Sequence, residues 1–317
     1  MKSILRKLPF FSKLYALAEQ VTRQYERIRD LESSLGEIIL GLDPAETLLK
    51  HYCRCSDGRA PDLTNPRSFN EKILWLNLYD NNPLKKVCAD KFSVRQYVAE
   101  KIGDEYLIPS LGVWNSFDEI DFSQLPEQFV LKPTHASGCN IIVKDKKKMN
   151  MAEMKKHFDY WLSVDYSRFF LEKCYQGIPR RILAETYIKN DDGDDLLDYK
   201  FFCIHGDVKL CWVDLDRSKN HKRNVYDTEW NLLPLTIQYP SSSRIVKKPD
   251  NFTSMLEIAK KLSSPFYQVR VDLYNHGGKI YFGELTFVSG AGWEIFTPDS
   301  YNYKLGEMLH LPEKRNP

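Results

Sequence analysis

The residues best placed to do chemistry lie in two alternating segments near the C-terminus, 268–274 and 279–287, which a Gly-containing turn separates. Strand alternation puts Arg270 and Asp272 on one face of the first segment. With a three-residue loop, Arg270 lies opposite Glu284 and Asp272 is its diagonal neighbour. A two-residue loop instead places Asp272 and Glu284 on opposite faces. The first register predicts a converging pair of carboxylates beside an arginine.

Paired carboxylates of this kind suit Mg²⁺, which takes one or two protein carboxylates and completes its shell with water and phosphates. The alternative is a surface salt bridge between Arg270 and Glu284, which needs no metal. The hairpin alone leaves both interpretations open.

A second chemical feature is the lysine at the end of the apolar strand 129–132. Lys132 is followed by a loop of mostly small residues, among them Thr134, Ser137 and Gly138. The lysine charge and the free backbone N–H groups of such a loop can hold a polyphosphate. The segment is not a Walker A loop, because no G-K-[ST] sequence follows. An ordinary hairpin loop is the alternative.

A third feature is the apolar strand 182–188, which carries a single acid, Glu185, into a polar turn. That carboxylate can accept a hydrogen bond from an adenine amino group while the backbone that follows offers a pairing edge. The alternative is a strand-end acid in water.

These side chains must be positioned by a mixture of helices and antiparallel strands. Ser68 and Glu71 form a capping-box signature for a helix over 68–79. Periodicity predicts further helices over 85–101, 151–164 and 252–262, and a hairpin over 199–204 and 208–215. Most sequential strands are joined by short turns, so the predicted class is α+β with antiparallel sheets.

Apolar residues recur at heptad spacing over residues 14–38. This pattern fits a coiled coil with a second copy or a partner, and equally a long helix lying on its own domain. The basic and aromatic tip over residues 1–11 suits contact with a membrane surface, although such a patch is more often solvated. No run reaches the roughly 18 apolar residues of a membrane span, and the tip is not a convincing secretory signal, so a cytoplasmic protein is expected.

Composition sets broader limits. The chain has 317 residues, 43% of them hydrophobic, enough for a sizeable core. Its 45 Lys and Arg against 43 Asp and Glu give a net charge of +2, which argues against a nucleic-acid partner. Its 7 cysteines form no C-x-x-C pair and are expected to be reduced thiols.

Taken in chain order, these features resemble the ATP-grasp superfamily. The resemblance rests on Asp90-Lys91 opening a helix, Lys132-Pro133, the hinge 185–188, and the Arg270-x-Asp272 and Glu284-x-Thr286 strands. The segments 65–72, 198–202 and 283–287 look like the TupA-like branch, which is associated with bacterial teichuronopeptide, capsule and O-antigen synthesis. The resemblance covers about Leu63 to Leu311 and implies a nucleotide held between two antiparallel-sheet subdomains.

The resemblance implies four regions along the chain. These are the heptad helix over 1–42, an N-terminal ATP-grasp subdomain over 43–125, a central subdomain with the phosphate loop over 126–190, and a C-terminal subdomain with the metal site over 191–317. The long N-terminal helix precedes the ATP-grasp fold proper.

It also implies an ATP-dependent ligase that joins a carboxylate to an amine through an acyl phosphate. Lys91 and Lys132 would hold the phosphates under the loop that contains Thr134, Ser137 and Gly138. Glu185 with the Tyr187 and Ile188 backbone would bind adenine.

The metal and the reacting groups would lie on the C-terminal strands. Asp272 and Glu284 would bind Mg²⁺. Thr286 stands where many ATP-grasp ligases have Asn, so the third ligand would be a hydroxyl or a water, or there would be none. Arg270, Lys132 and Lys200 are the expected catalytic residues, with Arg270 steadying the acyl phosphate and the oxyanion.

A basic cluster containing Arg217, His221 and Arg223 suits an anionic acceptor such as a uronic acid, a nucleotide sugar or a polysaccharide. A solvated loop is the alternative. Ser289 and Gly290 follow the metal strand in a loop whose glycines permit close backbone approach, and they form the expected acceptor pocket.

Three functions therefore remain. The first is a ligase that amidates a uronic acid of a surface polysaccharide or its precursor with an amino acid or amine. The second is a sugar kinase built on the same nucleotide site. The third is a nucleotide-binding scaffold that recruits a glycosyltransferase, or a second copy, through residues 14–38, in the cytoplasm or at the inner membrane face.

Overall fold

The computed structural model describes residues 61–168, 171–188, 196–216 and 220–313. The predicted heptad helix over 14–38, Cys53, Cys55 and Arg217 lie outside the described residues. The cysteines that the structure describes are free thiols, as expected. Among the described residues, every helix is too short or too polar to cross a bilayer.

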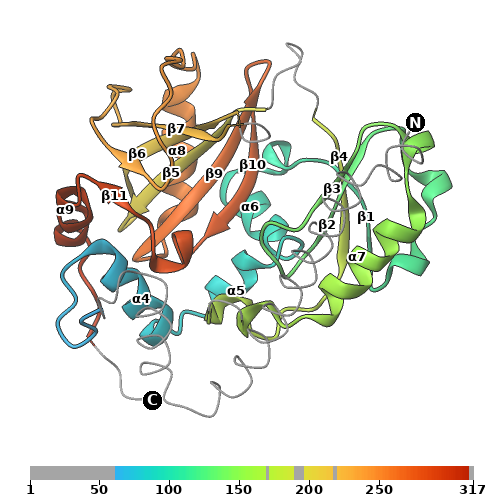
Figure 1. Cartoon of the computed structure of the whole chain (residues 1–317), viewed down its shortest axis with the longest axis horizontal. Helices are drawn as coiled ribbons and strands as arrows, with labels where there is room; N and C mark the ends of the chain where they lie inside the picture. The colour runs from blue at the N-terminus through green and yellow to red at the C-terminus, as the bar shows by residue number, and fades with distance from the viewer. Residues whose placement is uncertain (1–60, 169–170, 189–195, 217–219, 314–317) are drawn as a thin grey trace, which may run out of the picture.

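Two antiparallel sheets stand side by side and define the molecule (Figure 1). The larger sheet has five strands in the order β10-β9-β5-β6-β7. These strands are β5 (Asp198–Ile204), β6 (Asp207–Leu215), β7 (Lys222–Tyr226), β9 (Gln268–His276) and β10 (Lys279–Thr286). One face is covered by α8 (Phe252–Ser263), which packs against β5, β6 and β9. Phe201, Val271 and Leu262 are fully buried in this core.

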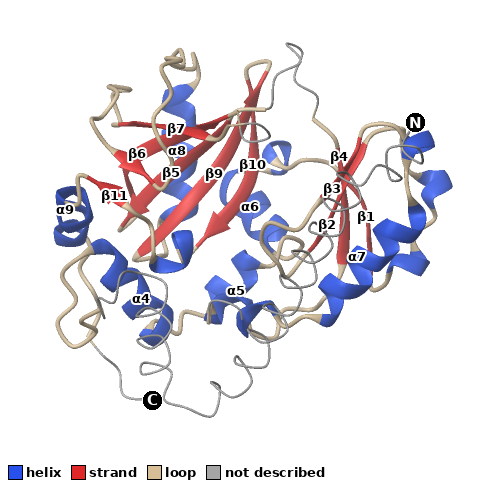
Figure 2. Ribbon diagram, viewed as in Figure 1, coloured by secondary structure: helices blue, strands red, loops and turns tan. Residues whose placement is uncertain are grey.

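The smaller sheet has four strands in the order β1-β4-β2-β3. These strands are β1 (Ser110–Trp114), β2 (Phe129–Pro133), β3 (Ile141–Val143) and β4 (Ile182–Thr186). The helix α7 (Met151–Ser163) supplies Phe158 to a separate core with Phe129 and Leu131, and all three are fully buried. The predicted α+β class with antiparallel sheets is confirmed (Figure 2).

Short helices line the base of both sheets (Figure 1). α4 (Phe69–Tyr79) begins at Ser68 with the predicted capping box to Glu71, and it packs on α9 (Ser300–Met308). A two-stranded sheet of β8 (Thr236–Ile237) and β11 (Phe296–Thr297) lies beside α9.

The single helix predicted over 85–101 is wrong. The structure has α5 (Leu84–Ala89) and α6 (Val94–Ile102), separated by a turn at Asp90. Asp90 is 2% exposed, and its carboxylate accepts hydrogen bonds from the Phe92 N–H and the Ser93 hydroxyl. These local bonds compete with the helical ladder and break it, which sets the adjacent Lys91 at the break.

The register of the last hairpin also differs from the prediction. His276 pairs with Lys279 across a two-residue turn, Gly277-Gly278, in which both glycines have positive φ. A bulge at Gly283 then shifts the register so that Glu284 pairs with Asp272. The expected three-residue loop is therefore wrong. The bulge nevertheless places Asp272 and Glu284 on the same face of the sheet, as the three-residue loop was expected to do.

Candidate functional site

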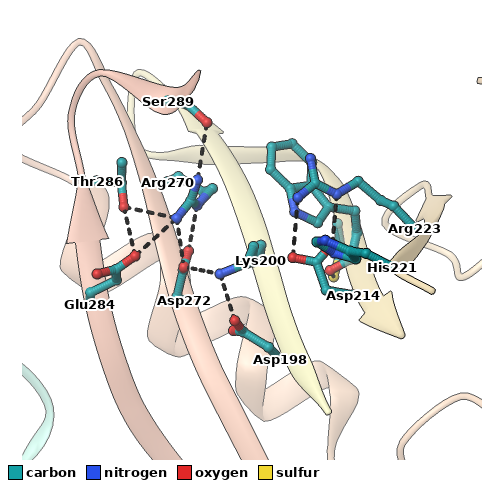
Figure 3. A network of polar contacts seen from close by, with 12 residues as sticks. Asp198, Lys200, Asp214, His221, Arg223, Arg270, Asp272, Glu284, Thr286 and Ser289 are labelled. Carbon is teal, nitrogen blue, oxygen red and sulfur yellow. Dashed lines mark hydrogen bonds and ion pairs between the residues drawn. The ribbon is translucent and has the colours of Figure 1, made fainter. Parts of the chain in front are cut away.

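The face of the five-stranded sheet opposite α8 carries a buried network centred on Arg270 (Figure 3). Arg270 donates from Nε to Asp272 Oδ1 and from Nη2 to Asp272 Oδ2, both at 2.7 Å. Its Nη2 also reaches Glu284 Oε1 at 3.1 Å and Thr286 Oγ1 at 3.0 Å. Its Nη1 donates to Ser289 Oγ at 3.1 Å. The guanidinium thus links both strands of the last hairpin to the loop that follows them.

Lys200 extends the network to a third strand, because β5 pairs with β9 and sets Lys200 beside Asp272. Its ammonium contacts Asp272 Oδ2 and lies 2.6 Å from Asp198 Oδ2. Burial alone would raise the pKa of Asp272, but Arg270 and Lys200 hold it well below its ordinary value. Asp272 therefore stays ionised, and both of its oxygens are occupied.

The carboxylates of this network offer a magnesium ion only a few free oxygen atoms. Glu284 offers Oε2, and its side chain is 33% exposed, so it can bind a cation directly. Asp272 is held by Arg270 and Lys200, which leaves it little free coordination capacity. Mg²⁺ needs only one or two protein carboxylates. Among the described residues, no three acidic, His or Cys side chains gather as a metal site.

The predicted phosphate residues lie on the smaller sheet and at the helix break. Lys91 contacts the carbonyl oxygen of Ala136 in the loop after β2. Among the described residues it has no carboxylate in ion-pair contact, and burial lowers its pKa while the charge of Glu284 raises it. Lys91 is therefore a partly buried cation that experiences the charge of Glu284 on the other sheet.

Lys132 and Glu185 lie side by side on β2 and β4 and form an ion pair. Glu185 also accepts from Arg95 Nη1 of α6 at 3.0 Å. The Glu185 carboxylate that was expected to meet adenine is thus held by two cations. Tyr187 and Ile188 directly follow β4.

The residues of the predicted phosphate loop make different contacts from one another. The Thr134 hydroxyl is buried and donates to the Pro179 carbonyl at 2.9 Å, so it faces its own scaffold. The Ser137 carbonyl accepts from the Tyr166 hydroxyl at 2.7 Å. Gly138 has φ +72° and open space where a side chain would begin. Gly138 leaves room for a ligand at this point of the loop.

The described members of the basic acceptor cluster, His221 and Arg223, share one carboxylate partner. Arg223 is 5% exposed and makes a two-pronged ion pair with Asp214, at 2.7 and 3.1 Å. His221 Nε2 lies 3.1 Å from the same carboxylate, and the His221 ring stacks on Tyr239. Arg223 also lies over the rings of Trp212 and Tyr239. The charge expected to bind an anionic acceptor is therefore already matched by Asp214.

Ser289 and Gly290 lie in a short 3-10 turn, η7 (Ser289–Gly292), directly after β10. The Ser289 hydroxyl accepts from Arg270 and bonds Glu294 Oε1 at 3.2 Å. Gly290 has φ +53°, and a Cβ there would stand 2.3 Å from Glu294 Cγ. The loop thus joins the Arg270 network to Glu294, and only glycine fits at 290.

With this geometry in place, comparison with protein families becomes decisive. The profile described as TupA-like ATPgrasp matches residues 71–310, most of the chain. The chain belongs to the TupA-like ATP-grasp family. The expected family is thereby confirmed. None of the curated proteins compared matches the sequence significantly.

Some solved structures also match the chain, at low identity. The Sphaerobacter thermophilus RimK domain protein ATP-grasp is 11% identical, with 84% of this chain and 96% of that chain covered and a TM-score of 0.43. The ATP complex of Bacillus anthracis D-alanine–D-alanine ligase is 15% identical, with 70% and 65% covered and a TM-score of 0.44. The chain thus spans just under two thirds of that ligase, and similarity at this level says nothing about its substrates.

Several polar residues of this ATP-grasp site escaped the sequence analysis. Asp198, two residues before Lys200, shares its face of β5, so strand alternation could have found it. Arg95 has no such signal, because its partner Glu185 is distant in sequence. Asp214 lies opposite Arg223 across β6 and β7, so only the register of those two strands could have found it. Glu294 lies in a loop without periodicity.

Glu172 is the other residue that was missed. It is 8% exposed, and Asn77 of α4 holds the peptide groups on both sides of it, donating to Leu171 O at 2.9 Å and accepting from Lys173 N at 3.1 Å. Burial raises the pKa of Glu172 to about 8, and the charge of Glu284 adds to the shift while Arg270 and Lys91 oppose it. A buried carboxyl with a raised pKa therefore lies within electrostatic range of the candidate site.

Proposed function

We propose that this chain is a Mg·ATP-dependent carboxylate–amine ligase that activates its acid as an acyl phosphate. The observation that carries the proposal is a partly buried Lys91, without an ion-paired carboxylate among the described residues, within electrostatic range of Glu284 in the Arg270 network. A lysine without a carboxylate partner suits phosphate, and a partly exposed carboxylate nearby suits the magnesium that accompanies it. ATP and Mg²⁺ are the proposed cofactors.

Each side chain then has a proposed role. Lys91 holds phosphate oxygens, with Lys132 beside it and Gly138 giving the loop room to approach. Glu284 binds Mg²⁺, with Thr286 at its side, and the ion would offset phosphate charge. Arg270, fixed by Asp272, presents a rigid guanidinium to the charge that develops on the acyl group.

The adenine, metal and acceptor assignments follow the family resemblance. Glu185 and the backbone of Tyr187 and Ile188 are proposed to bind adenine. Asp272 is proposed as the weaker metal partner, because Arg270 and Lys200 already occupy it.

The proposed substrates are a uronic acid of a surface polysaccharide or its precursor, and an amino acid or other amine. The proposed acceptor groups are Ser289, Gly290, His221 and Arg217, of which Arg217 lies outside the described residues. Arg223 supports this surface through its stacking and its bond to Asp214. A cytoplasmic location, contact with the inner membrane face, and a partner bound through residues 14–38 remain predictions.

The test is release of ADP from Mg·ATP across a panel of uronic acids and nucleotide-linked uronic acids crossed with amino acids. ADP formed only when acid and amine are both present is the expected result. Glu284→Ala should abolish it, because the only carboxylate in the network with an exposed side chain is lost. Glu257→Ala, an exposed acid on α8, is the matched control and should retain activity.

Two other outcomes would redirect the assignment. ADP formed with sugars that lack any carboxylate would replace the ligase with a sugar kinase. ATP binding without consumption under every combination would favour a scaffold that recruits a glycosyltransferase or a second copy.

A further inference from the structure

A buried carboxylate with an unmatched oxygen lies next to the proposed reaction centre. Glu294 is 7% exposed, yet its Oε2 accepts no hydrogen bond from any described residue. Its other oxygen receives the Ser289 hydroxyl at 3.2 Å and lies 3.8 Å from Arg223 Nη1. A buried acceptor left without a partner is costly, so a ligand atom that satisfies it would be bound favourably.

The charges around Glu294 indicate the sign of that ligand. Arg223 is the one permanent cation in contact with Glu294 among the described residues, and Asp214 already engages it through two hydrogen bonds. Two carboxylates therefore share the Arg223 guanidinium, and Arg270 acts on Glu294 only from beyond ion-pair contact, with the Ser289 hydroxyl between them. Burial raises the pKa of Glu294, as expected for a carboxylate whose charge is poorly matched.

The position of Glu294 near Arg270 indicates which of the two substrates it would bind. Ser289 bonds both Glu294 and Arg270, so one hydroxyl separates the unmatched carboxylate from the guanidinium proposed to hold the acyl phosphate. An amine held at Glu294 as its ammonium ion would stand beside the activated acid, and it would give one proton to the carboxylate before its neutral nitrogen attacked. A magnesium ion is a poor match, because it requires several hard oxygen ligands and one free oxygen is available here.

We infer that Glu294 is the ammonium-binding residue of the second substrate, a primary amine such as an amino acid or amino sugar. The inference rests on the proposed ligase function and specifies its amine site. Gly290 is part of that site, because any side chain there would displace the Glu294 carboxylate. The Ser289 hydroxyl orients the carboxylate by fixing Oε1, which leaves Oε2 for the substrate N–H donors.

A binding experiment tests the inference without turnover. The probe is glycinamide, a small monocation without a carboxylate, titrated calorimetrically into the full chain in the presence of Mg·ADP, with neutral acetamide as the comparison. Wild type should bind glycinamide, and Glu294→Gln should weaken binding about tenfold or more through loss of a charge-assisted hydrogen bond. Glu229→Gln, at an exposed position, should bind like wild type. Absence of wild-type binding, or equal binding to Glu294→Gln, would overturn the inference.

A kinetic experiment separates this inference from the ligase proposal. Hydroxylamine is largely uncharged at neutral pH and intercepts acyl phosphates as hydroxamates. Glu294→Gln should make hydroxamate at the wild-type rate while its KM for the charged amine rises about tenfold or more. Equal loss of both reactions would mean that Glu294 supports the fold or the first half-reaction. If wild type made no hydroxamate with any acid, the ligase proposal itself would fail.

Gly290→Ala provides a second route if Glu294→Gln is unstable. It retains the carboxylate charge but forces it to move, since the new Cβ would fall 2.3 Å from Glu294 Cγ. Glycinamide binding, measured calorimetrically in the presence of Mg·ADP, should again weaken. Normal glycinamide binding by a folded Gly290→Ala protein would contradict the inference.

Discussion

At the scale of single residues, the site is organised by competition for a few buried charges. Asp272 is shared by Arg270 and Lys200, and Asp214 is shared by Arg223 and His221. A guanidinium held by two hydrogen bonds to a carboxylate loses little entropy when it meets a developing negative charge. Glu284 and Glu294 each use one oxygen in these contacts, which suits the metal and amine ligands proposed for them.

Arg270 should contribute strongly to stability. Its replacement by Met leaves Asp272 and Glu284 without their main partner in a buried network, and we expect a loss of about 3–5 kcal/mol in the free energy of unfolding. Urea denaturation measures this loss. Adding Asp272→Asn should recover part of it, because the unpaired charge is then removed. A stability equal to wild type would show that the network is not buried as described.

Glu172 should make the free energy of unfolding depend on pH in the direction opposite to that of an ordinary carboxylate. Burial raises its folded-state pKa to about 8, above the ordinary value of 4.5. The native state therefore holds the proton more tightly, and its stabilising contribution is complete below pH 4.5 and is lost as the pH rises to 8. Without metal or nucleotide, the wild type should lose up to about 1.4 kcal/mol per pH unit relative to Glu172→Gln in that range. A difference that stays constant from pH 5 to 8 would refute this assignment.

At the scale of elements, the sequence predicted strands and caps better than registers. The Ser68 capping box and the antiparallel hairpins follow from local signals and are confirmed. The bulge at Gly283 is visible only in the paired strands, and the local bonds that break the helix at Asp90 are joined by one from the distant Arg181 at 2.7 Å. Strand alternation therefore named Asp272 and Glu284 correctly, whereas their pairing depended on one extra residue that no periodicity reveals.

The packing of α9 on α4 should depend on Gly306. A Cβ at this position would stand 2.1 Å from the Arg67 carbonyl oxygen, just before the α4 cap. Backbone on both sides must then move, so Gly306→Ala should lower the free energy of unfolding by about 1–3 kcal/mol despite the better helix propensity of alanine. Thermal unfolding measures the change. Lys304→Ala, at an exposed position of the same helix, should shift the melting temperature far less.

At the scale of the whole molecule, long-range side-chain contacts bring the two sheets into one site. α6 packs on α8 of the larger sheet, and its Arg95 reaches Glu185 on β4 of the smaller one. Motif order along the chain suggested the family, but it could not show that Lys132 is bound by Glu185 or that Asp214 neutralises Arg223. Those pairings join residues that are distant in sequence, or depend on packing, so patterns in a single sequence do not predict them.

A nucleotide bound across the two sheets should stabilise the molecule as a unit, and Lys91 should control that effect. The ammonium lies at the helix break, contacts the β2–β3 loop at Ala136, and experiences the charge of Glu284 on the other sheet. At a Mg·ATP concentration of 100 times Kd, wild type should gain about 2.7 kcal/mol in the free energy of unfolding.

Lys91→Met removes the one cation placed to meet phosphate from the helix side, so the gain at the same Mg·ATP concentration should fall by at least about 1 kcal/mol. Without nucleotide, relief of the partly buried and unmatched ammonium should leave the variant at least as stable as wild type. Lys101→Met, an exposed lysine on α6, should keep the full response to Mg·ATP. An equal gain in Lys91→Met and wild type would show that Lys91 does not bind the nucleotide. The proposed function would then lose the residue through which the nucleotide joins the two sheets.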